Sequence, residues 1–301
     1  DVLKGINNVM ESGRFILGDN VKKLEDDVAK FSNSKYGIAV ANGSDALHIS
    51  LLGCGVKPGD EVIVPAFTFF ATAGAVARIG AIPVFVDIDE ETFNICPSSI
   101  EKAITENTKA IIPVHLYGQM AEMEEIKQIA DKHDLVVIED AAQAIGSKQK
   151  GYNIGQLGTT ACYSFFPTKN LGAYGDAGMI ITDNNEIAEK MRVIRVHGSK
   201  PKYYHHVLGY NSRLDEMQAA ILNVKLPYLS EWNEKRRLHA QYYTELINKE
   251  LEGKVIPPIE KHSNYHIFHQ YTIRVKKRDE LQQFLKEHGI STMIYYPKPL
   301  H

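Results

Sequence analysis

The sequence predicts an α/β fold in which helices cover both faces of a mainly parallel sheet. Short apolar, β-branched runs recur along the chain without polar alternation, which is typical of strands that are buried on both faces. Amphipathic stretches of helical length separate most of these runs, and the resulting strand–helix–strand order favours parallel pairing. The expected architecture is a three-layer sandwich that carries a small C-terminal α+β domain.

The elements follow in chain order. Strands are expected at residues 36–41, 61–65, 82–87, 109–114 and 135–140, and helices at 44–55, 69–80, 97–105 and 121–133. From about residue 212 the sequence becomes helical and highly charged. The last stretch predicts a β-α-β unit formed by "HQYTIRV", "RDELQQFLKEHG" and "STMIYY". We therefore expect a large domain over residues 1–230 and a small domain over 231–301.

Composition excludes several classes of protein. Of the 301 residues, 44% are hydrophobic and 24% charged, which is ordinary for a soluble globular protein. The net charge of -3 provides no field for nucleic acid, and no apolar run reaches the roughly 18 residues of a membrane span. Three distant cysteines are expected to be reduced core residues. No His or Asp cluster has metal-ligand spacing. Without a signal peptide, the protein is expected to be cytoplasmic.

Polar residues follow the predicted strands, where ligands bind in parallel sheets. The stretch Asn42-Gly43-Ser44-Asp45 connects a strand to a helix. Its amides and hydroxyl could hold an anion, or it could simply cap the helix. Asp140 ends the fifth strand, where a carboxylate could bind a ribose, a metal or a protonated ring nitrogen, or cap the next helix. No G-x-G-x-x-G follows the first strand, which disfavours a nicotinamide dinucleotide site.

The segment "ACYSFFPTKNLGAYGDAGMI" (161–180) places Lys169 before three glycines, which we expect to let the backbone pass close to a ligand. By itself, Lys169 could contact phosphate, attack a carbonyl or lie on a loop. Pyridoxal phosphate (PLP) requires an anion site, a stacking ring, an anion for its pyridinium nitrogen and an amine for its aldehyde. The candidates, in that order, are Gly43 with Ser44 and Ser164, then Phe69, Asp140 and Lys169.

Five segments in order give the sequence a resemblance to a known family. They are "ANGSDALHISLLGCGVKPGDEVIVPAFTFFATA", "PVHLYGQ", "VIEDAAQAIGS", "SFFPTKNLGAYGDAG" and "GYNSRLDEMQAAIL". With them the chain resembles the DegT/DnrJ/EryC1/StrS family of PLP-dependent nucleotide-sugar aminotransferases over essentially its whole length. The resemblance implies the PLP transferase fold type I of aspartate aminotransferase. It also implies a homodimer with shared active sites, and a small domain that is incomplete over 231–301.

The resemblance assigns the cofactor-binding roles. Lys169 matches the lysine that bonds to the PLP aldehyde, and Asp140 matches the acid that pairs with the ring nitrogen. Gln143 matches a residue beside the O3′ atom of the cofactor, and Phe69 occupies the stacking position. The phosphate is expected to lie among Gly43, Ser44 and Ser164.

Four further residues are assigned to the subunit interface and the substrate. Asn211 matches an asparagine that reaches the phosphate bound by the neighbouring subunit. Arg213 matches a residue that contacts substrate across the same interface. Tyr295 and Tyr296 match a His-Tyr or Tyr-Tyr pair near the sugar.

The activity implied is transfer of an amino group from L-glutamate to a keto-sugar nucleotide, for cell-surface polysaccharide or amino-sugar biosynthesis. The stretch "YYHHVLGYNSRLD" is similar to the branch that aminates C3, with UDP-2-acetamido-3-keto-glucuronate or dTDP-3-keto-6-deoxyhexose substrates. A C4 aminotransferase of a 4-keto-6-deoxy nucleotide sugar is the alternative. A PLP-dependent sugar dehydratase would carry histidine in place of Lys169. A non-enzymatic regulatory relative is disfavoured because Lys169 and Asp140 are both present.

Overall fold

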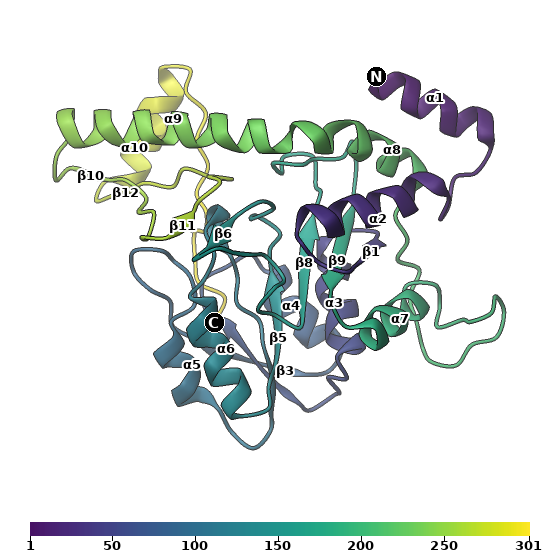
Figure 1. The fold of residues 1–301 in the computed structure, drawn as a ribbon. Coiled ribbons are helices and arrows are strands. Elements are labelled where there is room, and N and C mark those ends of the chain that lie inside the picture. Colours follow the sequence, from purple (N-terminus) through teal and green to yellow (C-terminus); the bar gives the residue numbers. More distant parts are fainter.

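A seven-stranded sheet forms the centre of the computed structural model, which describes residues 1–301 (Figure 1). Its strands are β1 (Tyr36–Val40), β2 (Glu61–Pro65), β3 (Ile82–Val86), β4 (Thr108–Ile111), β5 (Val136–Asp140), β8 (Thr160–Ser164) and β9 (Gly178–Thr182). Their order across the sheet is β1-β9-β8-β5-β4-β2-β3. Only β9 runs antiparallel to its neighbours, β1 and β8, so the predicted α/β class with a mainly parallel sheet is confirmed.

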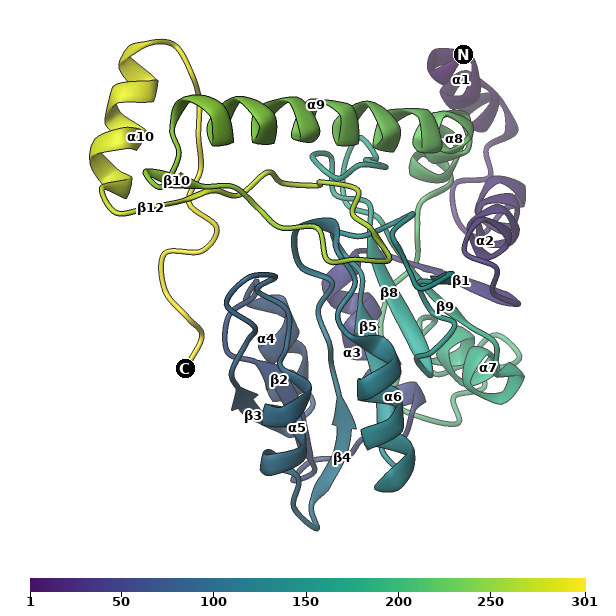
Figure 2. The same ribbon diagram turned by 60° about the vertical axis from the view of Figure 1, so that its left-hand side comes forward.

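Helices cover both faces of this sheet, as Figure 2 shows. One face packs against α2 (Asp19–Phe31), α5 (Pro97–Ala103), α6 (Met123–Lys132) and α8 (Glu216–Lys225). The other packs against α3 (Gly43–Gly53), α4 (Ala71–Arg78) and α7 (Asn185–Ile194). Successive strand residues enter opposite cores: Val137 lies in the first and Ile138 in the second. This alternation explains why the strands read as continuous apolar runs.

Both N-terminal helices contact α8, and α2 also packs against β1. Helix α1 (Val2–Ser12) packs on α8. The Glu216 carboxylate accepts the backbone N–H of Asn20 at 3.0 Å and that of Val21 at 2.9 Å. These amides lie in the first turn of α2, where a carboxylate satisfies free donors and complements the helix dipole. None of the helices combines the length and apolar composition that a bilayer span needs.

The long helix α9 (Leu229–Glu250) follows α8 and a 3₁₀ turn, η2 (Leu226–Tyr228), and crosses above the sheet in Figure 1. The remaining elements are a hairpin of β6 (Lys148–Gln149) and β7 (Tyr152–Asn153), and then β10 (Val255–Ile256), β11 (Asn264–Tyr265), β12 (Arg274–Val275) and α10 (Arg278–Glu287). Helix α9 begins at Leu229, close to the expected boundary near residue 230. The division into 1–230 and 231–301 stays a prediction.

The expected β-α-β unit at the C-terminus is wrong in its strands. The first strand is reduced to the two residues of β12, which pair antiparallel with β10, and no strand forms over 291–296. The backbone of the second segment finds another partner, because the carbonyl of Tyr295 accepts the hydroxyl of Tyr117. The segment therefore packs against a loop of the large sheet instead of extending a small one.

Candidate active site

Residues distant in sequence meet at the carboxyl edge of the sheet. Asp140 is the last residue of β5 and Ser164 the last of β8, while Gly43 opens the helix that follows β1. These three strands run in one direction, so their ends lie at the same edge. The structure thus brings together polar residues that the sequence analysis selected in three separate segments of the chain.

The start of α3 forms a cradle for an anion. Asn42 caps the helix, and its Oδ1 accepts the N–H of Asp45 at 2.8 Å. The amides of Gly43 and Ser44 belong to the first turn, where helix geometry provides no partner. A Cβ atom on Gly43 would lie 2.6 Å from the Cβ of Ser164, so a side chain there would fill the cradle. These three residues therefore fit the phosphate group of PLP.

The glycines after Lys169 serve close packing within the chain. A Cβ on Gly178 would lie 2.8 Å from the amide nitrogen of Gly43, so this glycine lets β9 pass against the cradle. A Cβ on Gly172 would overlap the carbonyl oxygen of Pro167, and one on Gly175 would lie 3.0 Å from the Gln218 amide. That these glycines let the backbone pass close to a ligand stays a prediction, and Gly178 is the one that lies against the cradle.

Asp140 is a buried carboxylate held by neutral donors. Its side chain belongs to a residue only 6% exposed. The hydroxyl of Thr72 donates to Oδ2 at 2.8 Å, and the N–H of Ala142 donates to Oδ1 at 3.2 Å. Burial raises the pKa of Asp140, although these hydrogen bonds and the charge of Lys169 act in the opposite direction. A protonated ring nitrogen beside this carboxylate would compensate its burial.

Lys169 lies in the turn after β8. Its backbone N–H donates to the carbonyl of Phe166 at 2.8 Å, which fixes the turn. Burial lowers the pKa of the Lys169 ammonium, while the charge of Asp140 raises it. A lowered pKa enlarges the fraction of neutral amine, which is the nucleophilic form. The structure thus places the Lys169 amine within electrostatic reach of a buried carboxylate.

Gln143 joins the sheet edge to the C-terminal segment. Its Oε1 accepts the N–H of Tyr117 at 2.7 Å, and its Nε2 donates to the hydroxyl of Tyr296 at 3.1 Å. Burial raises the pKa of Tyr296 to about 12, so this phenol stays protonated near neutral pH. Tyr295 is held through its carbonyl by the Tyr117 hydroxyl. Both tyrosines of the predicted pair therefore lie beside the candidate site.

Phe69 supplies an aromatic face near the start of α4. The residue is 56% exposed, and its ring centroid lies 6.2 Å from that of Tyr296. The ring of Phe67 lies 5.9 Å from the same tyrosine. Such an exposed ring beside half-buried aromatic neighbours is available for stacking on a planar ligand.

Asn211 and Arg213 make no hydrogen bond to the other candidate residues of their own chain. Asn211 is exposed, whereas Arg213 is half-buried and its Nε atom is buried without a hydrogen-bond partner. An unpartnered guanidinium nitrogen is costly to bury. The exposure of Leu208, at 95%, shows that the preceding loop also presents apolar surface to solvent.

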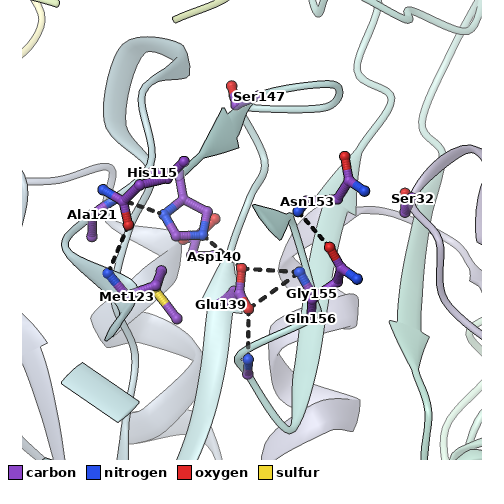
Figure 3. A network of polar contacts seen from close by, with 12 residues as sticks. Ser32, His115, Ala121, Met123, Glu139, Asp140, Ser147, Asn153, Gly155 and Gln156 are labelled. Atoms are coloured by element: carbon purple, nitrogen blue, oxygen red, sulfur yellow. Dashed lines mark hydrogen bonds and ion pairs between the residues drawn. The ribbon is translucent and has the colours of Figure 1, made fainter. Parts of the chain in front are cut away.

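A buried network lies on the opposite face of β5 from Asp140 (Figure 3). Glu139 accepts the N–H groups of Gly155 and Gly158, at 3.1 and 2.8 Å, and contacts His115 Nε2 at 2.8 Å. His115 Nδ1 accepts the N–H of Ala121 at 3.1 Å, which leaves the proton on Nε2 to donate to Glu139. The backbone N–H of His115 donates to the backbone carbonyl of Asp140 at 3.0 Å. The network is thus joined to the backbone of the residue that carries the carboxylate.

The sequence analysis did not identify Thr72, His115 or Glu139. Thr72 follows the predicted stacking residue Phe69 by three positions, which was the one available signal: Phe69 lies just before α4 and Thr72 in its first turn. Alternation along β5 indicates only that neighbouring Glu139 points away from Asp140. The alternation does not reveal that His115 contacts Glu139 on that face.

Comparisons with known proteins agree with this geometry. The DegT/DnrJ/EryC1/StrS aminotransferase family matches residues 1–301. A "Pleiotropic regulatory protein" of Geobacillus stearothermophilus is 67% identical over all of this chain and 81% of its own length. The "UDP-N-acetyl-3-dehydro-alpha-D-glucosamine 3-aminotransferase" of Acidithiobacillus ferrooxidans is 48% identical, with the same coverage of 100% and 81%.

Two solved structures extend the comparison. The S. venezuelae protein DesV, in complex with a ketimine intermediate, has a TM-score of 0.96 and 41% identity, covering 100% of this chain and 80% of its own. NtdA of Bacillus subtilis, with bound cofactor PMP, has a TM-score of 0.92 and 38% identity, covering 100% and 69%. The predicted fold, cofactor chemistry and enzyme class are confirmed at this level. The chain belongs to the DegT/DnrJ/EryC1/StrS aminotransferase family.

Proposed function

We propose that the protein is a PLP-dependent aminotransferase that moves an amino group from L-glutamate to C3 of a keto-sugar nucleotide. The observation that carries this proposal is the buried Asp140 carboxylate within electrostatic range of Lys169, at the same sheet edge as the narrow cradle at Gly43. Bound PLP would supply an electron sink for carbanion chemistry. The protein itself would then need to move protons, balance the charge of the cofactor and orient the substrates.

Lys169 and Asp140 perform the chemistry. The Lys169 amine would hold the cofactor through its aldehyde carbon. Once displaced by the amino donor, the same amine would be the group that accepts a proton from the donor Cα and returns one at C4′. Asp140 keeps the ring nitrogen protonated, and Thr72 holds one carboxylate oxygen in position.

The remaining residues bind and orient. Gly43, Ser44 and Ser164 hold the phosphate, and Phe69 stacks on the ring. Gln143 serves the O3′ atom, since its amide is already oriented by Tyr117. We propose that Tyr295 and Tyr296 face the sugar, because both lie on the C-terminal segment beside Gln143.

The C3 assignment rests on the resemblance of "YYHHVLGYNSRLD" and on the relatives. The Acidithiobacillus relative is named for amination at C3. Amination at C4 is the alternative. The Geobacillus relative is named for regulation, yet the present chain keeps an amine and a buried carboxylate in the arrangement that catalysis needs. We therefore favour an enzyme, acting in the cytoplasm on amino-sugar precursors.

A panel of keto sugars tests the substrate. We expect the purified protein, with PLP and L-glutamate, to aminate 3-keto nucleotide sugars. Mass spectrometry and NMR of the product would locate the new C–N bond. Matched 4-keto-6-deoxy nucleotide sugars should react at least about 100-fold more slowly, since a misplaced carbonyl loses the near-attack geometry. Amination of the 4-keto compounds alone would favour the alternative, amination at C4. If none of the keto sugars were aminated, the proposal that the protein is a sugar aminotransferase would be contradicted.

We further propose that the functional unit is a homodimer in which Asn211 and Arg213 serve the partner's site. This is supported by the exposure of Asn211 and by the unpartnered Nε of Arg213. Two-fold symmetry would make the contribution reciprocal. Each site would then combine Lys169 of one subunit with the lent residues of the other.

Mixed dimers test this arrangement. Lys169→Ala and the double variant Asn211→Ala with Arg213→Ala should each be nearly inactive as homodimers. After subunit exchange at equal amounts, half of the dimers are mixed and each contains one intact site. Activity should therefore return to about a quarter of the wild-type level. Differential tags would verify that mixed dimers form. Verified mixed dimers with no recovered activity would show that each subunit supplies all its own residues.

A further inference from the structure

A chain of buried amides begins beside Lys169. Asn170 follows the lysine and is 7% exposed, and its Nδ2 donates to Asn233 Oδ1 at 2.7 Å. Asn233, on α9, is 2% exposed, and its Nδ2 donates to the carbonyl of Ile145 at 3.0 Å. The other end of the chain is His269, whose Nδ1 lies 3.1 Å from Asn170 Oδ1. The turn that carries Lys169 is thus tied to α9 and to the segment that follows β11.

The direction of each hydrogen bond in this chain is determined. Asn170 Nδ2 donates to Asn233 and also lies 3.4 Å from the carbonyl of Ile267, so Asn170 Oδ1 is the acceptor. His269 Nδ1 must therefore carry a proton and donate it to Asn170. In a neutral imidazole, the lone pair then resides on Nε2.

The surroundings keep the His269 ring neutral. Burial, together with the charges of Lys169 and Arg236, lowers the pKa of His269 to about 3. Arg236, one turn after Asn233 on α9, also donates to the carbonyl of His269 at 3.3 Å. Asp140 faces Lys169 from β5 and is the acidic group that acts on it. A neutral ring within electrostatic range of the Lys169 amine adds no second positive charge there.

The same segment is fixed from the other side of the site. The N–H of Ile267 donates to the carbonyl of Gly118 at 3.0 Å, and that of Gln270 donates to the carbonyl of Tyr117 at 3.3 Å. Tyr117 is the residue that orients Gln143 and holds Tyr295. His269 therefore lies where the lysine turn, the long helix and the substrate-side loop meet.

We infer that His269 is a positioning residue for Lys169, which acts through Asn170 and keeps water from the amine. The inference rests on the proposed PLP chemistry but concerns a residue that this chemistry does not itself require. Its predicted signature is electrostatic. If water replaced the imidazole, the cationic form of the Lys169 nitrogen would be better solvated, and its protonation midpoint would rise.

The bound cofactor reports this midpoint through its visible absorption, which changes when the nitrogen shared with Lys169 is protonated. In His269→Ala the midpoint of a pH titration should rise by about one unit, the equivalent of a tenfold change in the protonation ratio. His269→Asn keeps an N–H donor near the Nδ1 position, so its midpoint should stay within about 0.3 units of wild type. His288→Ala, at an exposed position on the end of α10, is the matched control and should leave the midpoint unchanged.

A role in stability alone would lower the melting temperature of His269→Ala without moving the midpoint, and this result would overturn the inference. An equal shift in His269→Asn and His269→Ala would also overturn it, because the Nδ1 donor would then be irrelevant. If His269→Ala does not fold, His269→Gln takes its place, since its amide donor lies nearer the Nε2 position. A wild-type protein that acquires no visible absorption with PLP would contradict the proposed function, and this inference with it.

Discussion

Borohydride reduction should attach the cofactor permanently to Lys169. The wild-type protein should be yellow when PLP is bound, because the lysine nitrogen extends the conjugation of the ring, and reduction should bleach it. Peptide mapping should then find the label on the peptide that contains Lys169. Lys169→Ala should lose both the colour of the linked cofactor and at least about 10³-fold of turnover, since the nucleophile and the proton carrier disappear together.

Lys225 is the natural competitor for this assignment. Burial lowers its pKa as well, and its ammonium donates to the carbonyl of Gly172 in the same loop region. Lys225→Arg keeps the charge and should retain the visible band. Label on the peptide containing Lys225, or an unchanged band in Lys169→Ala, would refute the role of Lys169.

Asp140→Asn should bind PLP but turn over at least about 100-fold more slowly. Loss of one preorganised electrostatic contact in a site that excludes water has an effect of this size. An amide carries no charge, so it cannot keep the ring nitrogen protonated, and the electron sink weakens. Steady-state rates and half-reaction rates with L-glutamate alone would measure the loss. Asp176→Asn, which changes an exposed acid in the lysine loop, should leave both rates unchanged.

The apoprotein separates chemistry from folding in this experiment. Without cofactor, the Asp140 carboxylate is buried among neutral donors, and replacing it with an amide removes an uncompensated charge. The melting temperature of apo Asp140→Asn should therefore equal or exceed that of the wild-type apoprotein. A variant that transaminates near the wild-type rate, whatever its stability, would refute the proposed role of Asp140.

The large sheet could be predicted because its strands are buried on both faces. Each expected strand overlaps an observed one, since apolar runs such as 61–65 are bounded by polar residues and turns. Strands β8 and β9 were not among the predicted strands, although the sequence of β9, "GMIIT", is apolar. Its antiparallel direction leaves no trace in the residue pattern. The segment 291–296 has strand-like residues but found no strand to pair with, because pairing depends on neighbours distant in sequence.

The site residues could be predicted where they lie at the end of a strand or at the start of the helix that follows one. Asp140 and Ser164 end strands, and Gly43 begins a helix, so their meeting at one edge follows from parallel pairing. His269 lies 100 positions after Lys169 on an irregular segment, so no local pattern connects them. For Asn211 and Arg213, the expected partner is a second copy of the chain. The roles that we propose for them depend on surfaces that only an assembled dimer would bring together.

The position of β9 sets the order in which the protein can mature. This strand lies between β1 and β8, and Tyr36 pairs with Thr182 across 146 positions of chain. A nascent chain that has emerged as far as Ser164 already contains both sides of the phosphate cradle, but nothing holds them together. Until residues 178–182 are synthesised, β1 has no partner and exposes a free edge, which is prone to aberrant pairing. We therefore expect the cradle to form, and the cofactor to bind, only after β9 has inserted between β1 and β8.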